Sequence, residues 1–359
     1  MIGIYLHIPF CKTRCPYCDF VSNAVSRPVP ETFVEAIRRE IADFAGPERP
    51  CTVFVGGGTP SLLEPGMLER ILAAIRSRFV LDDPEITIEA NPDDVTPLLV
   101  GAWLSMGVNR ISLGVQSFDD GVLHYLGRRH DAARARLACE VVSERCANWG
   151  MDLIFGAHPV DAWEATLDTC LLLAPKHISS YGLTYEARTP FIARRDEAID
   201  DETWLCLYRQ AEAHLAAYDH YEISNYALPG YACRHNLIYW RNLEYAGFGP
   251  GAYSFLDSAR SRNHVALDEY LAAPGGKCEA VRLMDHEIRV ETVVRHLRLR
   301  EGLSKEAYFT RFGSHVQDDF ALALDRLIAR GLIEEDAATF RPTRSGFELN
   351  NEIGLTLVD

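Results

Sequence analysis

The alternation of short β-prone runs with longer amphipathic runs constrains the fold of this chain most strongly. The two kinds of run follow one another over about the first half of the sequence. Predicted strands lie at 3–8, 52–55, 85–89, 110–114, 151–155 and 178–183, and predicted helices at 31–44, 66–78, 96–106, 132–146 and 162–173. Alternating β and α units predict a parallel sheet with right-handed crossovers.

Polar and glycine-rich segments follow the ends of four consecutive predicted strands, and their placement indicates the kind of parallel sheet. A doubly wound sheet gathers its functional loops at one switch point, whereas a β/α barrel distributes them around one end of the strands. The sequence therefore favours a partial (β/α)6 barrel. The segments are a cysteine triplet, Gly56-Gly57-Gly58-Thr59-Pro60, Glu89-Ala90-Asn91-Pro92 and Gln116-Ser117.

The pattern changes after about residue 200. A predicted helix at 202–218 precedes an aromatic and glycine-rich stretch at 221–255. From residue 286, three helical patterns precede two short β-prone runs, 332–334 and 339–342, as is typical of a winged-helix-like module in an α+β region. We predict a barrel over residues 1–200, an aromatic and glycine-rich region over 201–285 and a winged-helix-like module over 286–359.

Composition excludes several classes of protein. The 359-residue chain has a net charge of −15, so nucleic acid and anionic membrane surfaces would repel it. The C-terminal module itself holds more acidic than basic side chains, which disfavours DNA binding. No apolar run approaches the about 18 residues of a membrane span, and the N-terminus lacks the features of a signal peptide. We expect a protein of the reducing cytoplasm with no transmembrane segment and no nucleic-acid partner.

Three of the ten cysteines lie close together, directly after the first predicted strand. The spacing of Cys11, Cys15 and Cys18 lets one loop hold a cubic iron–sulfur cluster and leaves the fourth iron without a protein ligand. An open iron can chelate the amino and carboxylate groups of S-adenosylmethionine and reduce it. The alternatives are a zinc site, which needs a fourth ligand at usable spacing, and three unrelated thiols.

The sequence around the triplet resembles the radical S-adenosylmethionine (SAM) superfamily. Within it, the chain resembles the group of oxygen-independent coproporphyrinogen oxidases and HemW-type heme chaperones. Segments 5–11 and 15–20 carry the resemblance, and five further motifs follow in the family's order, at 56–61, 88–92, 109–118, 151–156 and 180–186. With the C-terminal module, the resemblance covers essentially the whole chain.

The resemblance implies a cofactor site made of a [4Fe-4S] cluster and S-adenosylmethionine. Gly57, Gly58 and Thr59 match the family's loop that contacts the methionine amino group, although a tight turn is the ordinary explanation of a glycine run. Glu89 at a strand end is a candidate acceptor for the ammonium group or a ribose hydroxyl. A solvated acidic residue is the alternative for Glu89.

Five further residues match cofactor contacts of the family. Gln116, Arg128 and Asp152 correspond to positions that contact a second S-adenosylmethionine in the oxidases. Tyr5 and Tyr17 match residues near the cofactor. The resemblance thus implies that these side chains lie around the loop that carries Cys11, Cys15 and Cys18, called the cysteine loop below.

Two positions separate the oxidases from the heme chaperones. The oxidases usually have a further cysteine where this chain has Phe20. The segment 235–240 matches the His-Asn-x-x-Tyr-Trp signature of the HemW branch, which makes His235 a candidate axial heme ligand. The alternatives are a core histidine for His235 and a simple buried thiol for the nearby Cys233.

The resemblance therefore implies a heme chaperone that holds a [4Fe-4S] cluster with S-adenosylmethionine and delivers heme to an acceptor, such as a respiratory protein. The alternative is a radical SAM enzyme of the oxidase-like group that acts on a porphyrin or another substrate.

One loop departs from the family pattern. After Gly156 the family usually continues with Leu-Pro-Gly-Gln, whereas this chain reads Ala157-His158-Pro159-Val160-Asp161. We expect this loop to face the active cavity, where His158 would affect access of the substrate or of heme.

Overall fold

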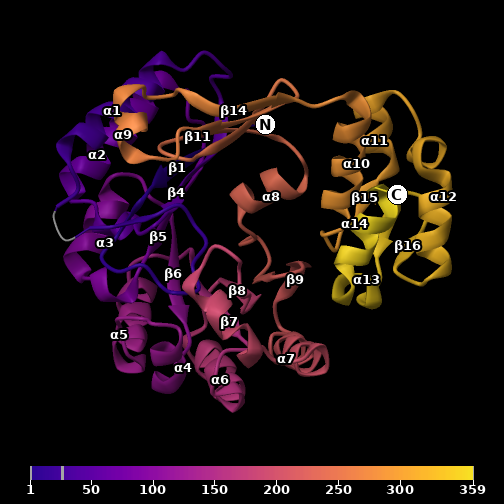
Figure 1. Cartoon of the computed structure of the whole chain (residues 1–359), viewed down its shortest axis with the longest axis horizontal. Helices are drawn as coiled ribbons and strands as arrows, with labels where there is room; N and C mark the ends of the chain where they lie inside the picture. The colour runs from indigo at the N-terminus through magenta and orange to yellow at the C-terminus, as the bar shows by residue number, and fades with distance from the viewer. Residues whose placement is uncertain (1, 26–27, 359) are drawn as a thin grey trace.

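Six parallel strands form the middle of a 12-stranded sheet in the computed structural model, which describes residues 2–25 and 28–358. The sheet curves into an open arc, with helices on its convex side (Figure 1). Each predicted strand overlaps one of the six, so the predicted partial barrel is confirmed. These strands are β1 (Ile2–Ile8), β4 (Pro50–Gly57), β5 (Glu85–Ala90), β6 (Arg110–Gln116), β7 (Trp149–Phe155) and β8 (His177–Gly182).

Five longer helices connect these strands, and each overlaps a predicted helix. Four of the five predictions overran by one to three residues and included capping residues: the Thr96 side chain accepts a hydrogen bond from the Leu99 N–H, so Thr96 precedes its helix. The helices are α1 (Glu31–Asp43), α2 (Pro65–Arg78), α3 (Pro97–Ser105), α5 (Ala132–Ser143) and α6 (Trp163–Leu173). The short helix α4 (Asp120–Tyr125) was not predicted, because six residues are too few to show helical periodicity.

The two faces of each parallel strand differ in polarity. On β1, the side chains of Ile4, Leu6 and Ile8 are fully buried in the apolar layer beneath the helices. The intervening Tyr5 and His7 point to the concave side, since successive side chains of a strand alternate. The concave side therefore forms a polar lumen, and the arc is not a sheet packed with apolar side chains on both faces.

Residues 201–285 extend both edges of the same sheet. At one edge β11 (Glu244–Phe248) pairs in parallel with β1, and β12 (Tyr253–Leu256), β13 (Ala259–Asn263) and β14 (Lys277–Arg282) follow in antiparallel order. At the other edge β10 (Asn225–Ala227) and β9 (Asp219–Glu222) follow β8. Helices α7 (Asp201–His214), α8 (Arg234–Trp240) and α9 (Leu267–Ala272) complete the region. The division of residues 1–285 into two units remains a prediction.

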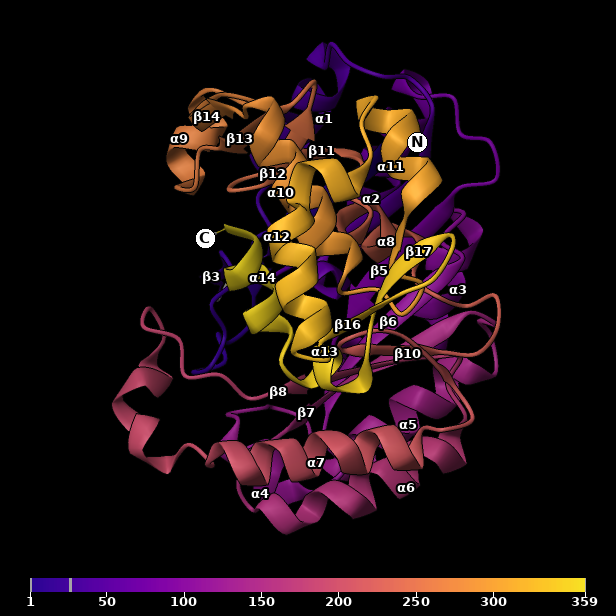
Figure 2. The ribbon, with the colours of Figure 1, turned by 90° about the vertical axis from the view of Figure 1, so that its right-hand side faces the viewer.

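The C-terminal module has its own apolar core, which includes Val293, Tyr308 and Phe340. As predicted, three helices precede a pair of β-strands, and an unpredicted short strand between the first two helices completes a three-stranded antiparallel sheet. Figures 1 and 2 show this module on the open side of the arc, beside α8. Its elements are α10 (Asp285–His296), β15 (Leu303–Ser304), α11 (Lys305–Phe312), α12 (Val316–Ala329), β16 (Ile333–Glu335), β17 (Thr339–Pro342), α13 (Arg344–Glu348) and α14 (Asn350–Val358). In the part of the chain that the structure describes, no helix combines the length and apolarity needed to cross a membrane.

Helix α8 packs so closely on β1 that a methyl group at Gly3 would meet Ile238, Thr52 and His235 at 2.9, 3.0 and 3.1 Å. We expect Gly3→Ala to lower the free energy of unfolding by about 1–2 kcal/mol through overpacking, measured by urea denaturation. The control Gly101→Ala lies in α3 with open space around it and is expected to stabilise by about 0.5–1 kcal/mol. Equal effects of the two substitutions would contradict the packing of α8 on β1.

Candidate functional site

The cysteine loop leaves the barrel at the C-terminal end of β1. Strand β2 (Phe10–Cys11) pairs in parallel with β3 (Asn23–Ala24), which closes the loop that carries Cys15 and Cys18. Within it, the Cys18 N–H donates to the Cys15 carbonyl at 3.1 Å. Cys11 is buried, the other two cysteines are half-buried, and all three are free thiols.

The three thiols lie close enough to influence one another. Burial is the largest cause that raises the pKa of Cys18, and the neighbouring Cys15 and Cys11 raise it further. The Thr59 hydroxyl donates to the Cys11 sulfur at 3.4 Å, and Arg128 Nη1 donates to the Cys15 sulfur at the same distance. Hydrogen-bond donors aimed at sulfur suit thiolate ligands of an iron–sulfur cluster. Over residues 2–25 and 28–358, no three His, Cys, Asp or Glu side chains form a site for a single metal ion.

The glycine loop after β4 passes directly beside the cysteine loop. A Cβ at Gly58 would lie 2.7 Å from the Phe10 carbonyl oxygen and 3.0 Å from the Cys11 sulfur. Gly57 has a φ of +114°, in the region that favours glycine. In this conformation the Gly57 N–H donates to Glu89 Oε2 at 3.1 Å. Gly58 therefore leaves room beside Cys11, whereas Gly57 is required by its positive φ and by the ring of His7, which lies 2.6 Å from the position of a Cβ.

Two carboxyl groups, Glu89 and Asp152, face the lumen beside the glycine loop. Burial and, to a smaller extent, the nearby Asp152 charge raise the pKa of Glu89 to about 8, although the Gly57 N–H and Arg110 act in the opposite direction. Burial also raises the pKa of Asp152, which accepts a hydrogen bond from the Ser112 hydroxyl at 3.3 Å. Such a pair suits a ligand that brings an ammonium group or hydroxyl donors.

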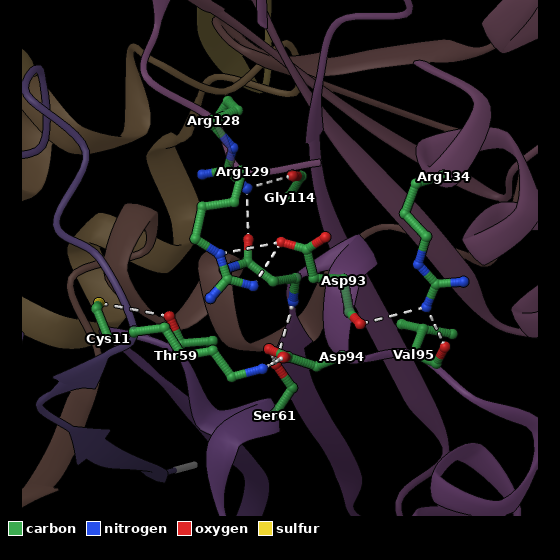
Figure 3. A network of polar contacts seen from close by, with 12 residues as sticks. Cys11, Thr59, Ser61, Asp93, Asp94, Val95, Gly114, Arg128, Arg129 and Arg134 are labelled. Atoms are coloured by element: carbon green, nitrogen blue, oxygen red, sulfur yellow. Dashed lines mark hydrogen bonds and ion pairs between the residues drawn. The ribbon is translucent and has the colours of Figure 1, made fainter. Parts of the chain in front are cut away.

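Arg128 connects the cysteine loop with the ends of β5 and β6, and Figure 3 shows it beside Gly114 of β6. Its Nη2 donates to the Gly114 carbonyl at 2.7 Å and to the Asn91 side chain. Its Nη1 donates to the Tyr17 hydroxyl at 3.4 Å as well as to the Cys15 sulfur. The resemblance pointed to Arg128 and Tyr17 as cofactor contacts, but no motif indicated the contact between Arg128 and Cys15.

Gln116 also lies near Arg128. Its backbone has a φ of +68°, and its amide nitrogen lies 3.0 Å from the position that a Cβ on Gly114 would occupy. The Gln116 side chain thus lies beside Gly114, as the Arg128 guanidinium does.

A second polar network, which the sequence did not indicate, holds the cysteine loop against the neighbouring loops. Lys12 donates to Asp94 at 2.6 Å, and the Ser61 hydroxyl donates to the other oxygen of Asp94 at 2.9 Å (Figure 3). The Asn91 N–H in turn donates to the Ser61 oxygen at 3.2 Å. A recess between these loops is lined by side chains that include Cys15 and Thr59.

Tyr5 lies in the lumen between the cysteine loop and α8. Its hydroxyl donates to His7 Nδ1 at 2.9 Å, and His7 Nε2 donates to the Val21 carbonyl at 2.8 Å. Its ring stacks on His235 with a centroid separation of 6.4 Å. Tyr5 therefore connects the loop after β1 with the interior of the arc.

His235 lies far from the cysteine loop along the strands, near the starts of β1 and β4. Its side chain is buried, with Nδ1 at 2.8 Å from the Thr52 hydroxyl and Nε2 at 2.9 Å from the Tyr239 hydroxyl. Burial lowers the pKa of His235 to about 3, so the imidazole is neutral. The structure thus brings most of the predicted cluster and cofactor residues together at the ends of the strands, and His235 contacts this group only through the ring of Tyr5.

The N-terminal end of α8 is held by one buried carboxylate. Glu85 accepts hydrogen bonds from the backbone N–H groups of Arg234 and His235, at 3.2 and 3.1 Å. The Cys233 thiol lies 3.7 Å from the same carboxylate and is completely buried. Cys233 is thus the simple buried thiol that we expected.

The unusual loop after β7 lies at the rim of the arc. His158 Nε2 donates to the Glu197 carbonyl at 2.8 Å. The rings of His158 and Tyr125 pack in a T-shaped arrangement with a centroid separation of 5.3 Å. The segment that contains Glu197 also contacts the cysteine loop, because the Phe191 N–H donates to the Pro16 carbonyl at 3.1 Å. His158 therefore fastens this loop to a neighbouring loop of the rim.

Comparison with known proteins gives three kinds of match. Residues 5–170 match the Radical SAM superfamily, and residues 283–349 match the HemN C-terminal domain. The chain is 42% identical to the heme chaperone HemW of Synechocystis sp., over 84% of this chain and 78% of that protein. It is 34% identical to the heme chaperone HemW of Escherichia coli, over 100% of this chain and 98% of that protein.

The structural match concerns the fold. Coproporphyrinogen III oxidase (HemN) from Escherichia coli superimposes with a TM-score of 0.86, covering 99% of this chain and 89% of that chain. The sequence identity in this superposition is 21%, so the match shows a shared architecture.

Replacement of Glu89 by Gln is expected to change the pH dependence of stability in the ligand-free protein. The folded state keeps the Glu89 proton up to about pH 8, whereas an unfolded glutamate loses it near pH ~4.3. The wild-type protein therefore loses stability as the pH rises through this interval, and the glutamine variant has no such titration. We expect Glu89→Gln to gain about 1–3 kcal/mol relative to wild type between pH 5 and 9, in urea unfolding at each pH.

The matched control is Glu140→Gln on the exposed surface of α5. Its unfolding free energy should follow that of the wild type at every pH. A Glu89→Gln profile parallel to the wild-type profile would contradict the burial of an uncompensated carboxyl group.

Proposed function

This chain belongs to the HemW family within the radical SAM superfamily, and we propose that it is a heme chaperone that binds heme and delivers it to an acceptor protein. The observation that carries the proposal is the 31–42% identity to relatives of that name over most of the chain. Phe20, at the position of the further cysteine of the oxidases, favours the chaperone branch. We propose the cytoplasm as the compartment and a respiratory protein as the kind of acceptor.

We further propose that Cys11, Cys15 and Cys18 hold a [4Fe-4S] cluster. Support comes from the three free thiols on one loop, the donors aimed at two of their sulfurs and the space that Gly58 leaves. When bound, such a cluster with an open iron supplies the capacity to chelate and reduce S-adenosylmethionine. The proposed contacts of S-adenosylmethionine are Tyr5, Tyr17, Gly57, Gly58, Thr59, Glu89, Gln116, Arg128 and Asp152. Of these, Gln116, Arg128 and Asp152 match the positions that contact a second S-adenosylmethionine in the oxidases.

His235 is the proposed axial ligand of the heme cargo. Its neutral imidazole suits iron, but both ring nitrogens have hydrogen-bond partners. Heme binding at His235 therefore requires that its hydrogen bond to Thr52 or to Tyr239 break. These two hydrogen bonds thus oppose heme binding at this histidine.

Replacement of Cys15 by Ser is expected to abolish the iron–sulfur absorbance of the anaerobically reconstituted protein, because one of three thiolate ligands is removed. The control Cys206→Ser changes an exposed cysteine of α7 and should leave iron content and the visible spectrum unchanged. A full cluster in Cys15→Ser would contradict the three-cysteine assignment.

Heme titration tests the chaperone function. Purified protein is expected to bind about one heme per chain, and His235→Ala should weaken binding at least about tenfold and alter the visible spectrum. Thr52→Val leaves the imidazole in place but removes one of its hydrogen bonds, so this variant should bind heme more tightly. Unchanged affinity and spectrum in His235→Ala, beside the control His286→Ala on the surface, would remove His235 from the heme site.

The same preparation, incubated with S-adenosylmethionine, a reductant and coproporphyrinogen, decides between carrier and enzyme. We expect heme binding without loss of carboxyl groups from coproporphyrinogen, measured by mass spectrometry. A decarboxylated product would replace the chaperone proposal with the oxidase alternative.

A further inference from the structure

Two side chains from distant parts of the chain donate hydrogen bonds to sulfurs of the cysteine loop. Thr59 follows β4 and donates to the Cys11 sulfur, and Arg128 follows α4 and donates to the Cys15 sulfur, each at 3.4 Å. Thr59 is 5% exposed, so water competes little for its hydroxyl. Figure 3 shows both Thr59 and Arg128 among the loops that surround the cysteines.

The guanidinium of Arg128 is held rigidly in this position. Its Nη2 donates to the Gly114 carbonyl at 2.7 Å and to the Asn91 side chain, which fixes the plane of the group. Its other hydrogen-bond partners are the Cys15 sulfur and the Tyr17 hydroxyl, and arginine keeps its charge in proteins. The positive charge is thus held at the cysteine loop.

The neighbouring arginine has a different environment. Arg129 forms an ion pair with Asp93 at 2.5 Å, so a carboxylate compensates its charge. The charge of Arg129 therefore lies against a carboxylate, whereas that of Arg128 lies against a candidate cluster ligand, Cys15. This difference provides a matched comparison for the effect of Arg128.

We propose that Arg128 and Thr59 are positioning residues that raise the reduction potential of the cluster held by Cys11, Cys15 and Cys18. One-electron reduction by an external reductant such as dithionite adds one negative charge, which spreads over the cluster and its thiolate ligands. Hydrogen-bond donors and a nearby cation stabilise this reduced form more than the oxidised form. Arg128 has the larger effect, because it adds a full charge to the hydrogen bond that Thr59 also provides.

A redox titration of the reconstituted full-length protein, without S-adenosylmethionine, tests this proposal. The reduced cluster is followed by electron paramagnetic resonance as dithionite lowers the potential. Arg128→Gln and Thr59→Val should each shift the midpoint to more negative values, Arg128→Gln by more. Arg128→Lys and Thr59→Ser, which keep the charge and the hydroxyl, should restore most of each shift.

Arg129→Gln is the control, since it removes an arginine next along the chain without removing a bond to sulfur. Its midpoint should match that of the wild type. An unchanged midpoint in Arg128→Gln, with full iron content, would overturn the role of Arg128. If Arg128→Gln does not retain a cluster, Thr59→Val decides, and an unchanged midpoint in that variant overturns the proposal.

The inference rests on the proposed cluster but can fail separately from it. A wild-type protein that assembles no cluster would refute the proposed cofactor. A cluster whose potential ignores both substitutions would refute only the role of these two donors, and heme titration remains an independent readout of the chaperone function.

Discussion

The placement of β1 between β4 and β11 is the constraint on which the rest of the structure depends. Both pairings are parallel, so β1 is enclosed along its length and its end cannot shift relative to its neighbours. Its apolar face lies in the core beneath the helices, and its polar face carries Tyr5 and His7 into the lumen. The cysteine loop begins where β1 ends. The loops after β4, β5 and β6 therefore reach it from one side with little freedom.

In the lumen, buried carboxyl groups lie near buried arginines, which limits the excess of buried charge. Glu89 and Asp152 both have pKa values raised by burial, and the positive groups that lower these pKa values are Arg110 for both and Arg128 for Asp152. Arg110 is 2% exposed, and acidic groups around it, including Glu85 and Asp152, favour its charged form. A ligand that brings an ammonium group would favour the deprotonated carboxylates and complete this balance.

The proposed cofactor site and the proposed heme ligand lie toward opposite ends of the same strands. The cysteine loop follows the C-terminal end of β1, whereas α8 and His235 close the lumen near the strand starts, where Glu85 holds the helix by its N–H groups. Tyr5 contacts the surroundings of both, through His7 and through stacking on His235. The residues of the proposed cluster site thus lie in a loop assembly joined by hydrogen bonds, whereas the proposed heme ligand, His235, has both ring nitrogens in hydrogen bonds.

Local patterns in the amino-acid sequence were enough to predict the strands, the helices between them and the family. Hydrophobic periodicity located the six parallel strands and the helices between them, because burial repeats every two residues in a strand and about every 3.6 in a helix. The spacing of Cys11, Cys15 and Cys18 and the order of the later motifs indicated the family.

The contacts between residues far apart in the sequence became known only from the three-dimensional structure. Examples are Arg128 with Cys15, 113 positions apart, and Thr52 with His235, 183 positions apart. The structure also decided that residues 219–282 extend both edges of the sheet, and that His235 is buried. The physical reason is that long-range hydrogen bonds depend on which strand ends and helices pack against one another. A periodic pattern in the sequence predicts the elements but does not show how they pack.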